Sequence, residues 1–223
     1  MKPKLLFILF CLICIDANAY NFDIKNYTVE ARFKANAISA SIMFSYQTSS
    51  NFYMLQYNIE QENNPRLRPH HWNGDPVCDA EIELNQFFED IDLTQWHVTK
   101  IVVTDGSHYK AYLDDVQIYE SDEVGGETLA FGSIGTRAAW SGNIGESADF
   151  KITNNDTGEV IYDNDFSDPS RSFSNGTVSD GIYHSEGSTD NEKRGLPIDP
   201  IMSAVKDMHY TVEADMTILE NCA

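Results

Sequence analysis

Six side chains between residues 51 and 140 belong to types that hold a polyhydroxylated ligand: Asn51, Gln56, Arg68, His70, Trp72 and Trp140. Planar amide, guanidinium and imidazole groups hydrogen-bond hydroxyls, and an indole ring offers a flat apolar surface for stacking. Arg68 and His70 share one strand parity, so both should project from the same side. We predict one carbohydrate-binding patch, with Trp72 or Trp140 as its stacking surface. The alternative is that Arg68 pairs with surface carboxylates and that the tryptophans fill the core or the bases of loops.

A run of acidic residues near residue 165 is a second candidate site. Asp163, Asp165 and Asp168 stand within the segment Ile-Tyr-Asp-Asn-Asp-Phe-Ser-Asp at 161–168. Carboxylate oxygens suit Ca²⁺, so these three residues are candidate metal ligands and Ca²⁺ is the cofactor that they suggest. The spacing is not that of an EF-hand loop, and a solvated acidic turn is the alternative interpretation.

A catalytic arrangement is hard to find in the chain. Glycoside hydrolysis normally needs two opposed carboxyl groups, and no such pair stands out. The sequence shows no Ser/His/Asp arrangement and no His-Glu-x-x-His motif. Binding without catalysis is therefore favoured for this chain, and hydrolysis of a glycan by the chain itself is the less favoured alternative.

The candidate side chains must be positioned by β-strands, because alternation with a period of two runs through the sequence. Residues 27–34, 99–103 and 109–113 alternate between apolar and polar side chains, with turn signals at 105–106 and 114–115. This pattern predicts antiparallel strands with one dry face, which a second sheet must cover. No amphipathic helix longer than a turn or two is evident. The predicted fold is an all-β antiparallel β-sandwich.

The first nineteen residues are predicted to be a cleaved signal peptide. Lys2 and Lys4 precede an apolar run at residues 5–15, and Ala17-Asn18-Ala19 supplies small residues for cleavage. The run is short for a membrane span, although an uncleaved anchor is the alternative. A formal net charge of −20 argues against binding to nucleic acid or anionic lipid. We expect a secreted, extracellular protein that has no membrane contact after signal cleavage.

The rest of the chain divides into three parts. Residues 20–184 are predicted to form the sandwich domain, and residues 185–208 change to a polar, glycine-bearing composition typical of a linker. The segment Tyr-Thr-Val-Glu-Ala at 210–214 repeats the segment at 27–31, so residues 209–223 are predicted to begin a truncated second copy. Coincidence is the alternative. Cys222 would then belong to that copy, which argues against a disulfide with Cys78.

Seven segments together resemble a concanavalin A-like, laminin-G-like jelly-roll domain. They are Tyr-Thr-Val-Glu-Ala (27–31), Asn-Phe-Tyr-Met-Leu-Gln (51–56), Leu-Arg-Pro-His (67–70), Trp-His (96–97), Tyr-Leu-Asp (112–114), Gly-Ser-Ile-Gly-Thr-Arg (132–137) and the acidic segment at 161–168. More narrowly, they resemble the lectin-like accessory domains of secreted α-L-rhamnosidases and related glycoside hydrolases. The resemblance covers residues 22–184 and again 209–223.

The resemblance implies a module that binds a glycan or polysaccharide and serves a glycoside hydrolase. Rhamnose-binding members hold a Ca²⁺ that touches sugar hydroxyls, with ligands that include a polar pair before the aromatic strand. Ser50-Asn51 stands at that place here, and a serine hydroxyl brings no charge to a calcium site. The alternative from another class is a laminin-G-like adhesion module that binds a protein partner and no sugar.

Overall fold

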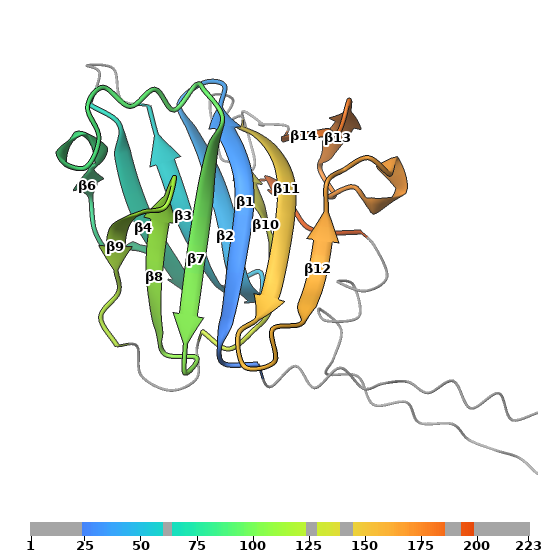
Figure 1. The fold of residues 1–223 in the computed structure, drawn as a ribbon, viewed down its shortest axis with the longest axis horizontal. Helices are drawn as coiled ribbons and strands as arrows, with labels where there is room; N and C mark the ends of the chain where they lie inside the picture. The colour runs from blue at the N-terminus through green and yellow to red at the C-terminus, as the bar shows by residue number, and fades with distance from the viewer. Residues whose placement is uncertain (1–23, 60–63, 124–128, 139–144, 186–192, 199–223) are drawn as a thin grey trace, which may run out of the picture.

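Two antiparallel β-sheets packed face to face form the protein (Figure 1). The computed structural model describes residues 24–59, 64–123, 129–138, 145–185 and 193–198. Within these residues the helical segments are two single 3₁₀ turns, η1 (Leu84–Gln86) and η2 (Pro169–Arg171). Neither is long and apolar enough to cross a membrane. The predicted all-β sandwich is confirmed.

The sheet nearer the viewer in Figure 1, here sheet A, has the strand order β13-β14-β11-β1-β7-β8-β9, with β12 also paired to β11. Its strands are β1 (Tyr27–Ala35), β7 (His97–Thr104), β8 (His108–Leu113), β9 (Val116–Glu120), β11 (Gly145–Asn154), β12 (Val160–Asn164), β13 (Gly176–Ser179) and β14 (Ile182–Ser185).

The sheet behind it, sheet B, has the strand order β15-β10-β2-β3-β4-β5, with β6 also paired to β4. Its strands are β2 (Ser39–Thr48), β3 (Asn51–Asn58), β4 (Arg66–Asn73), β5 (Asp75–Cys78), β6 (Ile82–Glu83), β10 (Ser133–Ala138) and β15 (Lys193–Gly195). Because β1 lies between β11 and β7, and β2 lies between β10 and β3, the chain crosses between sheets as a jelly roll does.

The alternation in the sequence determines which side of each strand meets the core. In β1 the side chains of Tyr27, Val29, Ala31 and Phe33 are buried between the sheets, whereas those between them face outward. The main core is formed in this way from both sheets. The predicted turns are also present: Asp114-Asp115 connects β8 to β9 with both residues in the left-handed region, as a two-residue hairpin turn requires.

Residues 75–78 form β5 against β4. One segment differs from the expectation drawn from the sequence. Residues 193–195, expected in a linker, form β15 against β10, and Leu196 packs against buried side chains of sheet B. The domain therefore extends at least to residue 198, beyond the boundary predicted at 184. The predicted signal peptide and the truncated second copy lie outside the described residues.

One buried hydrogen bond connects the two sheets. The Tyr57 hydroxyl in β3 and Thr99 Oγ1 in β7 lie 2.6 Å apart, and both side chains are fully buried. We expect Tyr57→Phe to lower the free energy of unfolding by about 1–2 kcal/mol, because it leaves the threonine hydroxyl without a partner. The double variant Tyr57→Phe/Thr99→Val removes both polar groups and should recover most of that loss. Urea unfolding measures both, and a double variant less stable than Tyr57→Phe alone would contradict this explanation.

Candidate functional site

The outer face of sheet B, directed away from the main core, gathers most of the predicted binding residues. Alternation along β3 directs Phe52, Met54 and Gln56 to this face, because Tyr53, Leu55 and Tyr57 fill the core. The register of β3 against β4 pairs Gln56 with Arg68 and Met54 with His70. Directly opposite residues in an antiparallel pair lie within side-chain contact distance. The structure therefore brings Gln56, Arg68 and His70 together on one face.

Asn51 does not join this group. It pairs with Asn73 at the end of β3, and its side-chain amide donates a hydrogen bond of 2.8 Å to Gln47 Oε1. The reason is parity: Asn51 and Gln56 are five residues apart in one strand, and an odd separation puts two side chains on opposite faces. The sequence contained this information once both residues were assigned to a single strand.

His70 is held as a neutral ring in the middle of the face. Its Nδ1 lies 3.0 Å from the Arg68 carbonyl oxygen. Desolvation lowers the pKa of His70, and the positive charges of Arg137 and Arg68 lower it further. A neutral imidazole has one donor and one acceptor nitrogen, so with Nδ1 donating to the carbonyl, Nε2 can accept from a hydroxyl.

Arg68 pairs with a surface carboxylate, which was the alternative interpretation of its role. It forms a salt bridge with Glu81, and the same carboxylate accepts a hydrogen bond of 3.1 Å from Arg66. The hydrogen bond and charge of Arg68 lower the pKa of Glu81. Arg66 also lies 3.6 Å from Glu83. Arg66 and Arg68 are thus held in a fixed network at the β4 edge of the face.

Trp72 lies buried beneath the outer face of sheet B and does not offer an open stacking surface. Its ring is 6% exposed and stacks on Phe52 with centroids 4.5 Å apart and an interplanar angle of 12°. The Arg137 guanidinium lies 4.9 Å from the Trp72 ring centroid. A second small hydrophobic cluster, formed by Met43, Tyr46, Phe52, Met54 and Trp72, supports these rings. A sugar ring would have to displace Arg137 to stack on Trp72. Trp140 lies outside the described residues.

Two arginines on this face were not among the predicted site residues. Arg137 of β10 and Arg194 of β15 are register partners across the antiparallel pair. The Arg194 guanidinium lies 4.5 Å from the Phe52 ring centroid and donates a hydrogen bond of 2.6 Å to the Ser49 carbonyl oxygen. Arg137 ends the segment at 132–137 that contributes to the resemblance, but the sequence pattern gave it no binding role. Arg194 lies in a three-residue strand, which is too short to show a period in the sequence.

The three acidic candidates near residue 165 are engaged in separate local roles. Asp163 is exposed on β12 opposite Lys151. Asp165 Oδ1 accepts from the Ser167 amide at 2.9 Å, and Asp168 Oδ1 accepts from the Ser170 amide at 2.9 Å, where it caps η2. Across the described residues, no group of three or more His, Cys, Asp or Glu side chains is arranged to hold a metal ion. The structure therefore does not gather these carboxylates into one site.

Comparisons with known proteins give only distant structural similarities. No known protein family and no curated protein sequence matches the chain. Carbohydrate-binding module CBM66 from Bacillus subtilis is 18% identical over 50% of this chain and 66% of its own, with a TM-score of 0.39. Sheep galectin-11 is 10% identical over 50% of this chain and 89% of its own, with a TM-score of 0.34. Scytalido-glutamic peptidase is 9% identical over 73% of this chain and 93% of its own, with a TM-score of 0.40. Similarities with such low identities and TM-scores do not show what the chain binds.

Proposed function

We propose that this chain is a secreted carbohydrate-binding module and that its glycan lies along the outer face of sheet B. The observation that carries the proposal is the group of half-buried polar side chains on this face: Gln56, Arg68 and His70. An amide, a guanidinium and a neutral imidazole, held by a rigid sheet, are suited to hydrogen-bond sugar hydroxyls. Sites on strands hold their groups more accurately than sites on loops.

The finer proposal is that the module targets a glycoside hydrolase, such as an α-L-rhamnosidase, of which this chain is the N-terminal part. It rests on the resemblance of the segments at 51–56, 67–70 and 132–137, all three of which supply residues of the outer face of sheet B. Ca²⁺ belongs to the same proposal, and a chelator tests it. Binding that survives chelation would show that the hydrogen-bonding residues of the face suffice without Ca²⁺.

The test is retention of the protein on immobilised polysaccharides, followed by calorimetry with soluble fragments. We expect Gln56→Ala and His70→Ala each to weaken binding by about 5–30-fold, because each removes hydrogen bonds worth about 1–2 kcal/mol. Glu30→Gln on the opposite sheet is the control, since Glu30 faces outward from β1. Capture of protein partners that no sugar competes away, with no retention on any polysaccharide, would instead favour the adhesion module.

A further inference from the structure

The outer face of sheet B has a polar end, which is formed by two rows of side chains across β2, β3 and β4. The strand registers give the rows as Ser39, Asn58 and Arg66, and then Ser41, Gln56 and Arg68. Beyond them the face becomes apolar, with the small cluster that includes Phe52 and Trp72. Asn58 shares its parity in β3 with Gln56, so it belongs to the same face, but it was not among the predicted site residues.

Asn58 is a buried amide whose acceptor atom is unsatisfied. The residue is 5% exposed, and its Oδ1 has no hydrogen-bond partner among the residues that the structure describes. Its neighbour across β2, Ser39, lies with its Oγ 3.4 Å from Gln56 Nε2 instead. Most buried polar side-chain atoms are hydrogen-bonded, and one that is not destabilises the fold. Oδ1 of Asn58 therefore needs a donor from outside the chain.

The arginines beside Asn58 leave donors unsatisfied as well. The register places Arg66 directly opposite Asn58 and Arg68 diagonally from it, both within reach of its side chain. The Nε atoms of Arg66 and Arg68 are buried and have no hydrogen-bond partner in the described part of the chain, whereas their terminal nitrogens bond Glu81. One acceptor and two N–H donors thus remain unpaired at the same end of the face.

This combination of unpaired atoms determines which chemical group fits. A carboxylate or a sulfate only accepts hydrogen bonds, so it cannot satisfy Asn58 Oδ1, and an ammonium group only donates, so it cannot satisfy Nε–H of an arginine. A hydroxyl both donates and accepts. Water has the same ability and can occupy the gap in the free protein, and a sugar hydroxyl that displaces this water keeps both bonds.

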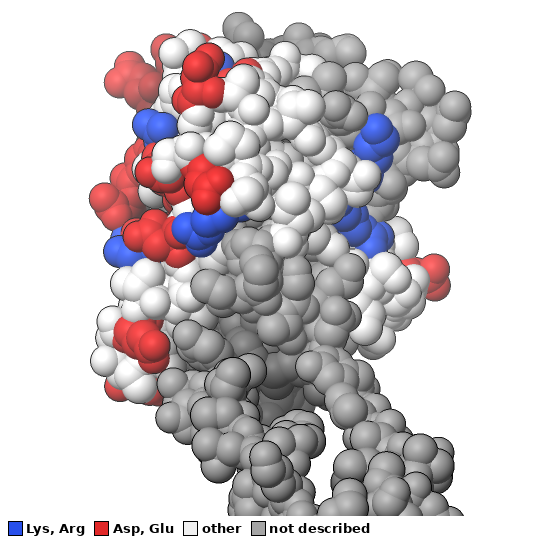
Figure 2. All heavy atoms as spheres, turned by 90° about the vertical axis from the view of Figure 1, so that its right-hand side faces the viewer, with Lys and Arg blue, Asp and Glu red and all other residues white. Residues whose placement is uncertain are grey.

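The charges at this end of the face also favour a neutral ligand. The guanidinium groups of Arg66 and Arg68 both contact the Glu81 carboxylate. Arg66 contacts Glu83 as well, so two carboxylates balance two guanidinium groups. Over the whole chain 35 acidic residues outnumber 15 Lys and Arg, and Figure 2 shows acidic side chains gathered at the left, on the side of sheet A. An acidic polysaccharide gains little from this end of the face and is repelled by the chain as a whole.

We propose that the module binds a neutral glycan and that one sugar hydroxyl enters the gap between Asn58 Oδ1 and the Nε–H groups of Arg66 and Arg68. The hydroxyl donates to the amide oxygen and accepts from a guanidinium group. Gln56 and His70, further along the face, hydrogen-bond hydroxyls of the adjoining sugar unit. This inference rests on the proposed carbohydrate-binding function, and it names the ligand class and a specificity-determining residue, Asn58.

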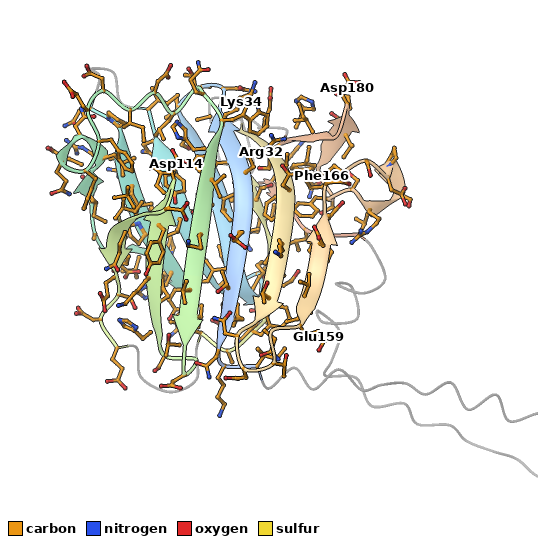
Figure 3. All side chains as sticks on the ribbon, in the orientation of Figure 1. Arg32, Lys34, Asp114, Glu159, Phe166 and Asp180 are labelled. Carbon is orange, nitrogen blue, oxygen red and sulfur yellow. The ribbon has the colours of Figure 1, made fainter. Side chains whose placement is uncertain are left out.

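A second buried asparagine offers a matched control. Asn164, at the end of β12 in sheet A, is 2% exposed. Its Nδ2 donates to the Arg171 carbonyl oxygen at 2.7 Å, and its Oδ1 accepts from the Phe166 amide at 3.0 Å. Figure 3 labels Phe166 at the right, next to β12. The side chain of Asn164 is therefore satisfied within the protein, whereas Oδ1 of Asn58 is not.

The experiment measures retention of the full chain on immobilised galactan, mannan, dextran and polygalacturonate, followed by calorimetry with oligosaccharides of the retained neutral polymer. We expect Asn58→Leu to weaken binding by at least about tenfold, because it removes the acceptor for the sugar hydroxyl. Its urea midpoint should be unchanged or higher, because leucine replaces an unpaired polar group at similar volume. Asn164→Leu should show the reverse, with a lower midpoint and unaltered affinity.

Monodeoxy analogues of the same oligosaccharide test the proposal on the unaltered protein, so this measurement does not depend on how a variant folds. Removal of one particular hydroxyl should weaken binding to the wild-type protein by about tenfold. The same analogue should bind Asn58→Leu no more weakly than the parent oligosaccharide does, because both changes remove the same hydrogen bonds.

Other outcomes separate the two proposals. Full affinity in Asn58→Leu would overturn this inference and leave the carbohydrate-binding function standing. If that variant also had a lower urea midpoint, Asn58 and a bound water would serve the fold alone. Tighter retention on polygalacturonate than on every neutral polymer would overturn the neutral ligand. Retention on none of the polysaccharides would overturn the proposed function and this inference together.

Discussion

Trp72→Ala is expected to lower the free energy of unfolding by about 3–5 kcal/mol and to abolish glycan binding. Trp72 is 6% exposed and is the largest side chain of the cluster on the outer face of sheet B. Removing its ring leaves a cavity beside Phe52 and takes away the surface under Arg137. Urea unfolding measures the first effect, and calorimetry with soluble polysaccharide fragments, at a temperature where the variant is folded, measures the second.

Two further variants separate packing from recognition. Trp72→Phe keeps an aromatic floor, so it should recover most of the stability and part of the affinity. Trp96→Ala removes a tryptophan whose ring contacts Arg32 and Lys34 of sheet A, and it should leave glycan binding unchanged. Full affinity in a folded Trp72→Ala protein would show that the glycan does not depend on Arg137 being held over this ring.

Gly135→Ala is expected to cost about 3 kcal/mol, the upper end of the usual cost of overpacking, and to weaken glycan binding strongly. A methyl group on Gly135 would overlap the Gly195 carbonyl oxygen and lie 2.9 Å from Met43 Cε. A backbone oxygen cannot rotate away, so β15 must separate from β10 and carry Arg194 away from Arg137. Glycine is required here because two backbones approach closely.

Gly158→Ala is the control for that substitution. A methyl group there meets no atom within 4 Å, but the residue has a φ of +74°. The expected cost is about 1 kcal/mol, from the left-handed conformation alone, with binding unchanged. Thermal unfolding and calorimetry on both variants provide the comparison. A Gly135→Ala protein with unaltered affinity would show that Arg194 does not contribute to the site.

Much of the fold could be predicted from the sequence because its determinants are local. The alternation at 27–34 and 109–113 determines which side chains enter the core, and the structure buries Tyr27, Phe33 and Leu113 as that pattern predicts. Turn residues are local as well: a two-residue hairpin turn needs left-handed backbone at both positions, which Asp114 and Asp115 supply. The common direction of Arg68 and His70 followed from the same period of two.

Two features of the candidate site could not be predicted in this way. The separation of Trp72 from solvent depends on Phe52 and on Arg137, which is 65 residues further along the chain. The structure does not gather the candidate Ca²⁺ ligands near residue 165 into one group, for a related reason. Asp165 and Asp168 have suitable chemistry, but each carboxylate bonds an amide two residues ahead and is held by its own turn.

The sequence by itself determined the longer strands, their buried faces, several turns and the shared side of Arg68 and His70, because these depend on neighbours within a few residues. Only the tertiary structure decided that Gln56 stands opposite Arg68 and that Arg194 stands opposite Arg137. Strand register and the recruitment of β15 depend on contacts between segments far apart in the chain. A strand of three residues has no period to read, and its place is determined by the sheet edge with which it pairs.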